Sequence, residues 1–272
     1  MRSPGDVEDS RDVSPILDAT DPHAWGPAID EAVNAVARGQ VVVLPTDTVY
    51  GVGADAFDPR AVQALLDAKG RGRQMPPPVL VPDVRTLDGL ATDVPGAARS
   101  LAAAFWPGAL TLIVTAQPSL TWDLGETRGT VALRVPDHPL ALALLRRTGP
   151  LAVSSANRTG RPAATTAADA AEQLGDAIAV VLDGGPTPGN APSTIVDATG
   201  DRLRVIRLGA IPLEELRTVA DVLGPDDEPA PEPHDEPTAE PHTEPHGEPA
   251  ADTRDEPAAE PADGAAAPGD GR

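Results

Sequence analysis

Cysteine is absent from the sequence, and lysine occurs once, as Lys69. The chain therefore cannot form disulfides, thiolate zinc sites or a cysteine nucleophile. No apolar run is long enough to span a bilayer, and Met1 to Ser14 lack the apolar block of a signal peptide. We therefore expect a protein that works in the cytoplasm, without attachment to a membrane.

Large apolar side chains are also missing from residues 225–272. This segment holds 15 acidic residues and two arginines, a net charge of −13 out of −21 for the whole chain. A segment that cannot bury apolar surface cannot offset the entropy lost on folding, and its like charges repel one another. Glu-Pro recurs every four residues from Glu228 to Pro249, a spacing that favours extended chain. We predict a disordered acidic tail, a spacer rather than a metal site despite its histidines.

The rest of the chain divides into a loose polar segment over residues 1–20 and one folded domain over residues 21–224. A domain of this size can bury a sizeable core. Residues 1–224 carry a net charge of −8. That acidic balance argues against general binding of a phosphate backbone, so any contact with nucleotide or RNA requires a local basic patch.

Apolar periodicity predicts alternating helices and strands in the domain. The predicted helices are 27–38, 58–69, 86–90, 95–105, 138–147, 169–174 and 212–223, and the predicted strands are 41–44, 78–81, 110–115, 130–135, 151–153, 178–182, 194–197 and 203–207. Several strands follow each other with no helix between them. This pattern indicates an α/β fold with one twisted mixed sheet and flanking helices, rather than a doubly wound parallel sheet.

A loop over residues 45–53 follows the first predicted strand and carries two threonines, an aspartate, the only tyrosine and two glycines. Ligands of open α/β sheets bind at such strand ends, and glycines let the backbone approach a ligand closely. An ordinary turn whose hydroxyls bond to the backbone is the alternative.

Three cations lie within five residues in Lys69-Gly70-Arg71-Gly72-Arg73, directly after a predicted helix. One of them would satisfy the negative end of the helix dipole. An ammonium group together with guanidinium forks also suits a triphosphate. The Gly-x-x-x-x-Gly-Lys-Ser/Thr order of a P-loop is absent.

Three further segments carry hydroxyls, amides or cations at strand ends. They are 105–111, 134–138 with 154–160, and 191–197 with 204–209. Serines and an asparagine after a strand can bind an anion. The frame Gly-x-Ser-x-Gly is missing, so we expect no covalent nucleophile. Packing of the aromatic residues under a strand and surface positions for the arginines are the structural alternatives.

In this order and spacing the segments resemble the threonylcarbamoyl-AMP synthase family, also called YrdC-like. The matching motifs are PTDTVYG, KGR, WPGALT, LRVPDH, SSANRTG, STIVD and a later RLG, between Gly26 and Gly209. The resemblance implies a twisted α/β sheet with a concave cationic cavity. It further implies synthesis of threonylcarbamoyl-AMP and pyrophosphate from threonine, bicarbonate and ATP. A tRNA threonylcarbamoyl transferase complex would use the product to modify tRNA, and any direct contact of this chain with tRNA would be weak.

The resemblance also implies roles for individual residues. Threonine would be bound by Thr48, Arg134, Ser193 and Thr194, and ATP by Lys69, Arg71, Thr111, Ser155, Asn157 and Arg207. Mg²⁺ would accompany the phosphates of ATP, and the sequence contains no pattern for an all-protein metal cage.

Two departures from the family pattern stand out. Many relatives carry a histidine at the end of the strand after KGR, where this chain has the apolar segment 78–82. Longer relatives continue into a second folded domain, where this chain has its acidic tail. One substrate contact and any role of that domain therefore do not transfer to this chain.

Two other functions remain as alternatives. The first is an RNA-binding or ribosome-maturation module that uses the same basic cavity, against which the acidic balance and the few aromatics argue. The second is a carbamoyl-transfer domain of a hydrogenase-maturation enzyme, which would bring zinc-binding and acyl-phosphatase segments that this sequence lacks. The tail could additionally serve as a docking arm for a basic partner.

The tail provides the first test. We expect deletion of residues 225–272 to leave turnover close to that of the full chain, because a solvated spacer contributes nothing to a preformed pocket. Threonine-dependent release of pyrophosphate from ATP measures this, and a large loss would show that the tail takes part in the reaction.

Overall fold

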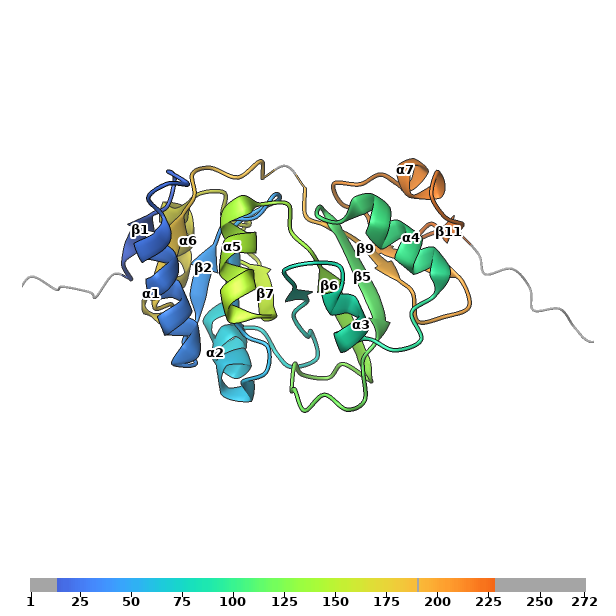
Figure 1. Cartoon of the computed structure of the whole chain (residues 1–272), viewed down its shortest axis with the longest axis horizontal. Helices are drawn as coiled ribbons and strands as arrows, with labels where there is room; N and C mark the ends of the chain where they lie inside the picture. The colour runs from blue at the N-terminus through green and yellow to red at the C-terminus, as the bar shows by residue number, and fades with distance from the viewer. Residues whose placement is uncertain (1–13, 190, 228–272) are drawn as a thin grey trace, which may run out of the picture. The chain divides into compact units, whose positions relative to one another are not determined.

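A computed structural model describes residues 14–189 and 191–227, which belong to one compact unit. Its described strands form a single mixed sheet of eleven strands (Figure 1). In spatial order these are β1 (Ile16–Asp18), β8 (Val180–Asp183), β2 (Val42–Leu44), β3 (Gly51–Asp55), β7 (Leu151–Ser155), β4 (Val79–Leu80), β6 (Thr130–Arg134), β5 (Leu110–Thr115), β9 (Thr194–Asp197), β10 (Leu203–Arg207) and β11 (Val222–Leu223). Parallel and antiparallel neighbours alternate irregularly, which confirms the mixed sheet predicted from the sequence.

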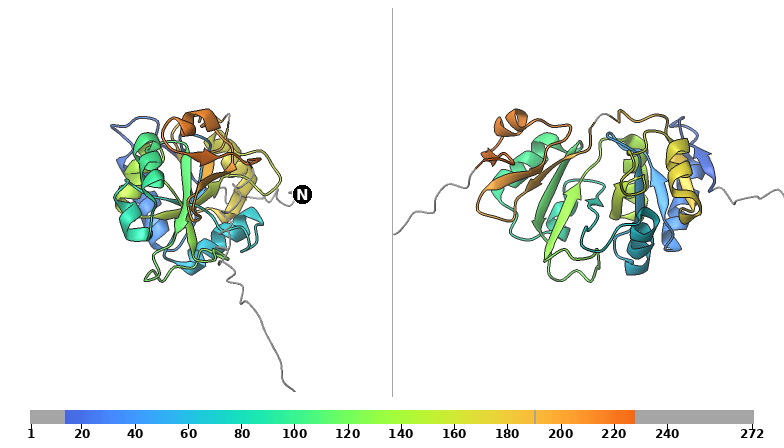
Figure 2. Two further views of the ribbon diagram at one scale, coloured as in Figure 1. Left: turned by 90° about the vertical axis from the view of Figure 1, so that its right-hand side faces the viewer. Right: turned by 180° about the vertical axis from the view of Figure 1, so that it is seen from behind.

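Helices flank this sheet (Figures 1 and 2). They are α1 (Gly26–Ala37), α2 (Pro59–Lys69), α3 (Thr86–Leu90), α4 (Gly96–Phe105), α5 (Pro139–Thr148), α6 (Ala167–Leu174) and α7 (Leu213–Arg217), with a 3₁₀ turn at Gly175–Ala177. The bounds of α2 follow from its sequence. The Asp58 carboxylate accepts from the backbone N–H groups of Arg60 and Ala61, and Gly70 ends the helix in the left-handed region at φ 61°.

The first half of the sheet is covered by helices on both faces. Val42 and Leu44 of β2 pack with α1 and α5, whereas Val43 and the preceding Val41 pack with α2 and α6. The two sets alternate because successive side chains of a strand point to opposite faces. A strand buried on both faces needs an unbroken apolar run, which explains why residues 41–44 do not alternate with polar ones.

The second half of the sheet has a different arrangement. On β5, Leu110, Leu112 and Val114 belong to a core that also contains residues of α3, α4 and α7. The side chains between them, Thr111 and Ile113, line a cavity on the opposite face. This half of the sheet therefore packs against helices on one face and borders a hollow on the other.

Three elements differ from the sequence-based expectations. Residues 51–53, predicted as loop, begin β3, where a Cβ on Gly51 would lie 2.7 Å from Val153 Cγ1, so glycine is required for close strand approach rather than for a flexible turn. Residues 212–223, predicted as one helix, form α7 and then β11, because Val222 is buried opposite Leu203 in the sheet. The N-terminal segment 1–20, expected to be loose, contributes β1, which pairs in parallel with β8.

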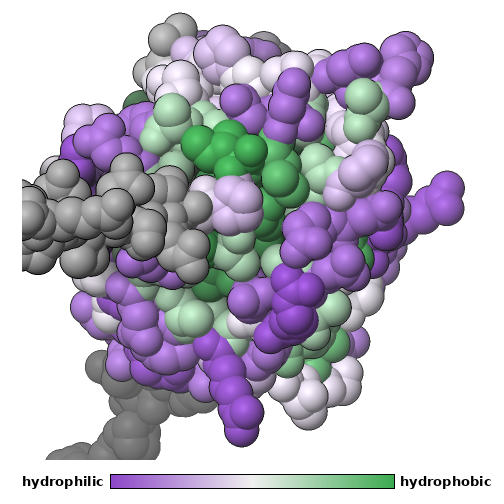
Figure 3. Space-filling model, turned by 90° about the vertical axis from the view of Figure 1, so that its left-hand side faces the viewer, coloured by the Kyte–Doolittle hydropathy of each residue, from purple (hydrophilic) through white to green (hydrophobic). Residues whose placement is uncertain are grey.

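Among the described strands, β1 lies at one edge of the sheet. Figure 3 looks at this end of the molecule and shows apolar surface surrounded by polar residues. Ile16 on β1 is 43% exposed. The strand has three residues, so it offers few free backbone groups for pairing with another chain.

At the other end, the described chain continues beyond the predicted domain boundary at residue 224. The Asp227 carboxylate accepts from the backbone N–H of Gly224 (2.7 Å) and pairs with Arg217. The tail from residue 228 onward lies outside the described residues. Among the described helices, none has the length and apolar character needed to cross a membrane.

Tyr50, the only tyrosine, gives a direct test of this packing. Its side chain is fully buried, and its hydroxyl donates to the Gly185 carbonyl (2.7 Å), two residues after β8. Burial, followed by the charge of Asp183, raises the pKa of Tyr50. We expect the folded protein to show no phenolate absorbance near pH 10, where free tyrosine ionises.

The corresponding contribution to stability is complete below the pKa of unfolded tyrosine, about 10, and is lost as the pH rises beyond it, since only the unfolded chain releases the proton there. Ultraviolet titration with Tyr50→Phe as the blank measures the ionisation of Tyr50 in the folded protein. Ionisation near pH 10 in the folded state would contradict the packing.

Candidate functional site

The cavity on the open face of the sheet has a volume of about 470 Å³. Segments far apart in the chain meet there, namely the β2–β3 loop, residues 71–78, β5, β6, the end of β7, and the start of β9 with the end of β10. Seven residues selected from the sequence line it: Thr48, Arg71, Thr111, Arg134, Ser155, Ser193 and Arg207. A volume of this size suits a small-molecule ligand.

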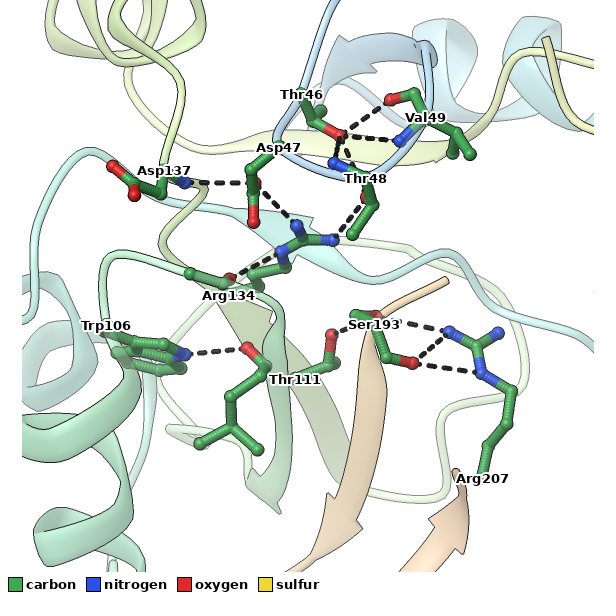
Figure 4. A network of polar contacts seen from close by, with 12 residues as sticks. Thr46, Asp47, Thr48, Val49, Trp106, Thr111, Arg134, Asp137, Ser193 and Arg207 are labelled. Atoms are coloured by element: carbon green, nitrogen blue, oxygen red, sulfur yellow. Dashed lines mark hydrogen bonds and ion pairs between the residues drawn. The ribbon is translucent and has the colours of Figure 1, made fainter. Parts of the chain in front are cut away.

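The loop between β2 and β3 is organised by Thr46. Its hydroxyl donates to the Val49 carbonyl (2.6 Å) and accepts from the backbone N–H groups of Thr48 (3.2 Å) and Val49 (3.3 Å). A hydroxyl that closes such a turn replaces backbone hydrogen bonds. The turn presents the Thr48 hydroxyl, 3.0 Å from that of Thr46, to the cavity (Figure 4).

Arg134, at the end of β6, is bound on three sides. Its Nε donates to the Gly108 carbonyl (2.9 Å), one terminal nitrogen donates to Thr48 Oγ1 (3.2 Å), and the other pairs with Asp47 Oδ1 (2.7 Å). Burial lowers the pKa of Arg134, and the charge of Asp47 opposes this effect. Arginine nonetheless stays protonated in proteins, so each terminal nitrogen keeps one N–H for a ligand.

A second arginine, Arg207, is bound to the start of β9. Its Nε and one terminal nitrogen donate to the Ser193 carbonyl at 3.2 and 2.8 Å. The Ser193 hydroxyl lies 2.9 Å from that of Thr111 on β5 (Figure 4). The guanidinium of β10, the hydroxyl of β5 and the hydroxyl of the residue before β9 thus form a cluster of hydrogen-bonding groups on one wall of the cavity.

A β-bulge aims Arg207 into the cavity. Leu203 and Val205 belong to the core, so strict alternation along β10 would bury residue 207 on the same face. The pairing shifts, however: Val205 lies opposite Val196, and Arg207 lies opposite Ile195, which lines the cavity. Ile206 is therefore one extra residue. Bulges of this kind re-aim side chains next to functional sites.

Arg71 is the third arginine of the cavity. One of its terminal nitrogens donates to Ser154 Oγ (3.1 Å), and its buried Nε has no partner among the described residues. Neither Arg71 nor Arg207 forms an ion pair within the described part of the chain. Burial and then the charges of Arg134 and Arg71 lower the pKa of Arg207.

Within the described residues, only one carboxylate, that of Asp47, is paired with any of these three guanidinium groups. Cations that are partly desolvated and repel one another are stabilised by an anion. The electrostatics of the cavity therefore favour a ligand with more than one negative charge.

Three of the selected residues do not line this cavity. The Lys69 ammonium donates to the carbonyl groups of Ser155 and Asn157. Asn157 donates its amide to the Arg158 (3.0 Å) and Arg161 (2.7 Å) carbonyls. Thr194 is fully buried, with its hydroxyl bonded to Gly209 and Ile211. In the structure all three organise backbone next to the lining.

Four further residues shape the site without standing among the ligands predicted from the sequence, namely Thr46, Asp47, Ser154 and Gly108. Thr46 and Asp47 lie in a selected motif, and the tendency of threonine and aspartate to close turns was the available signal. Gly108 acts through its carbonyl, which no residue type reveals. The segment that lacks the histidine of many relatives supplies apolar lining through Pro78 and Leu80, while Val81 is buried in the core.

Comparison with known proteins gives a consistent result. The family model Sua5_yciO_yrdC, described as telomere recombination, matches residues 34–209. A protein of Mycobacterium tuberculosis H37Rv named "Putative threonylcarbamoyl-AMP synthase" is 55% identical over 210 residues, which cover 77% of this chain and 95% of the relative. Threonylcarbamoyl-AMP synthase of Bacillus subtilis is 41% identical over 71% of this chain and 56% of its own length.

Solved structures agree with these sequence matches. Pyrococcus abyssi Sua5 in complex with L-threonine superposes with a TM-score of 0.73 at 34% identity, covering 77% of this chain and 62% of that protein. Escherichia coli YciO superposes with a TM-score of 0.66 at 25% identity, covering 75% of this chain and 99% of that protein.

The bulge generates a test that preserves composition. We expect an exchange of the residues at 206 and 207 (I206R/R207I) to weaken ATP binding on the order of tenfold, because only residue 207 lies opposite Ile195 and a charged hydrogen bond is lost. Isothermal titration measures the affinity. Ile206→Ala is the matched control, since it keeps the residue count and therefore the bulge. Full affinity in the exchanged variant would refute this register.

Proposed function

The chain belongs to the Sua5/YciO/YrdC family, and we infer that it is a threonylcarbamoyl-AMP synthase. Such an enzyme joins threonine, bicarbonate and ATP into threonylcarbamoyl-AMP and pyrophosphate. The observation that carries this inference is the convergence of Arg71, Arg134 and Arg207 on one cavity, whereas among the described residues only Arg134 is paired with a carboxylate, that of Asp47. Both an amino-acid carboxylate and a triphosphate supply the negative charge that this arrangement favours.

We propose that threonine binds at the Thr48 and Arg134 side of the cavity. The free N–H groups of Arg134 suit a carboxylate, and a threonine hydroxyl can exchange hydrogen bonds with Thr48 or Ser193. Asp47 holds the guanidinium in place while its own carboxylate stays paired. The complex of Pyrococcus abyssi Sua5 with L-threonine supports threonine as the ligand.

The phosphates of ATP would lie against Arg71, Ser155, Thr111 and Arg207. Guanidinium forks and hydroxyls are suited to phosphate oxygens. No group of three or more acidic, histidine or cysteine residues that could hold a metal occurs in the described residues. Magnesium would therefore reach the cavity as part of the ATP substrate, bound to its phosphates.

The reaction then requires two bond-forming steps. The threonine nitrogen attacks the carbon of bicarbonate, so that a C–N bond forms and hydroxide leaves as water with a proton from the amine. An oxygen of the resulting carbamate attacks the α-phosphorus of ATP, and the bond to the bridging oxygen of the β-phosphate breaks. Pyrophosphate leaves with the electron pair of that bond.

In this mechanism the residues of the chain act by position and charge. Guanidinium groups directed at the leaving pyrophosphate stabilise the charge that develops there. Holding carbamate and ATP side by side can lower a barrier by about 7–11 kcal/mol without a covalent intermediate on the protein. The product, a reactive mixed anhydride, would pass to a tRNA-modifying transferase in the cytoplasm.

The proposal is tested by mass spectrometry of the product formed from threonine, bicarbonate and ATP. We expect threonylcarbamoyl-AMP, with pyrophosphate release that depends on threonine. Arg71→Gln should lower kcat/KM for ATP on the order of tenfold or more, because a charged hydrogen-bond donor is removed from the cavity.

Arg73→Gln is the matched control within the same motif. Arg73 is directed away to an exposed ion pair with Asp123, and such pairs contribute little. Absence of the adenylate product would overturn the proposed activity, and equal losses in the two variants would overturn the role assigned to Arg71.

A further inference from the structure

Lys69, the last residue of α2, binds residues 155–159 through its side-chain ammonium and through its backbone carbonyl. Its ammonium donates to the Ser155 carbonyl, to the Asn157 carbonyl (2.7 Å) and to Asn157 Oδ1 (3.4 Å). Its backbone carbonyl accepts from the N–H (3.0 Å) and the hydroxyl (2.9 Å) of Thr159. One residue thus makes five hydrogen bonds to residues 155–159.

These contacts occupy the donors of the ammonium group. A lysine has three N–H donors, and each has an acceptor in this segment. The side chain is 4% exposed, and it is absent from the lining of the large cavity. A phosphate oxygen that bound the ammonium would have to displace one of these acceptors, either a backbone carbonyl or Asn157 Oδ1, and a buried acceptor left without a partner is unfavourable.

The segment that Lys69 holds leads directly into the cavity wall. Ser155 lines the cavity, and the hydroxyl of the preceding residue, Ser154, accepts from Arg71. Arg71 follows Lys69 by two residues, after the left-handed turn at Gly70. Lys69 therefore holds the segment from outside the cavity, and Arg71 contacts it from within.

The electrostatic setting agrees with this arrangement. Burial, followed by the charge of Arg71, lowers the pKa of Lys69 to about 8. None of the ion pairs among the described residues involves Lys69. Its partners are neutral carbonyl and amide oxygens.

We propose that Lys69 is a positioning residue, which fixes Ser154 and Ser155 at the cavity wall through the carbonyl groups of Ser155 and Asn157, and that it does not contact the phosphates of the nucleotide. The proposal rests on the proposed function only in naming the ligand of the cavity. The hydrogen bonds of Lys69 to residues 155–159, here called the clamp, are a property of the protein without ligand.

Hydrogen exchange of the nucleotide-free protein separates the two roles of Lys69. Lys69→Met keeps the apolar stem and removes the donors. We expect the amides of Ala156 and Thr159, which are bonded in the native fold, to exchange about tenfold or more faster in this variant. ATP affinity should fall as well, and Lys69→Arg should restore part of both.

Arg71→Gln is the matched control, since it removes a cation that lines the cavity and leaves the clamp intact. We expect it to weaken ATP binding without changing exchange at Ala156 and Thr159. Unchanged exchange in Lys69→Met together with weaker ATP binding would show a phosphate ligand and overturn the proposal. If ATP is not the ligand, neither variant will alter ATP binding, while the exchange result still decides the clamp.

A measurement on the wild-type chain covers the case in which Lys69→Met fails to fold. Because Lys69 is the only lysine, lysine labelled with ¹³C at Cε gives one signal, whose titration reports its pKa. Direct contact with a triphosphate would raise that pKa by about one to three units. We expect a rise of less than one unit on saturation with ATP, and a larger rise would overturn the proposal.

Discussion

The geometry of the cavity depends on one buried guanidinium. Arg134 leaves β6 and finds its partners 26 residues away at Gly108 and 87 residues away at Asp47. A cation taken out of water needs an opposite charge and acceptors for its donors, and loss of one partner from a buried pair costs about 3–5 kcal/mol. This requirement fastens the loop after β2 to the second half of the sheet and closes one side of the cavity.

The layering of the fold explains why a hollow exists there. Helices pack against both faces of the sheet around β2. Around β5 and β6 the helices pack on one face, and the opposite face carries Thr111, Ile113 and Arg134. A sheet face left open in this way collects ligand-binding groups from the strand ends and loops beside it, as in other α/β folds.

The residues of the site form two groups with different tasks. Arg71, Arg207 and Ser155 line the cavity and offer charge or hydrogen bonds to a ligand. Lys69 and Thr194 instead form hydrogen bonds with backbone groups of the segments that carry those residues. Catalysis by position and charge needs groups that are held in place before the substrate arrives. A buried polar residue near a site can therefore be essential without touching the ligand.

The sequence by itself determined most of the elements and the set of chemical groups. Periodicity and caps such as Asp58 with Gly70 act over a few residues, so α2 and the strand of residues 42–44 were predictable. The motifs also identified most of the lining. Only the tertiary structure decided that an extra residue in β10 directs Arg207 to the cavity instead of the core. It also decided that the ammonium of Lys69 donates to carbonyl groups of the protein. Both depend on partners far away in the chain, which local patterns do not encode.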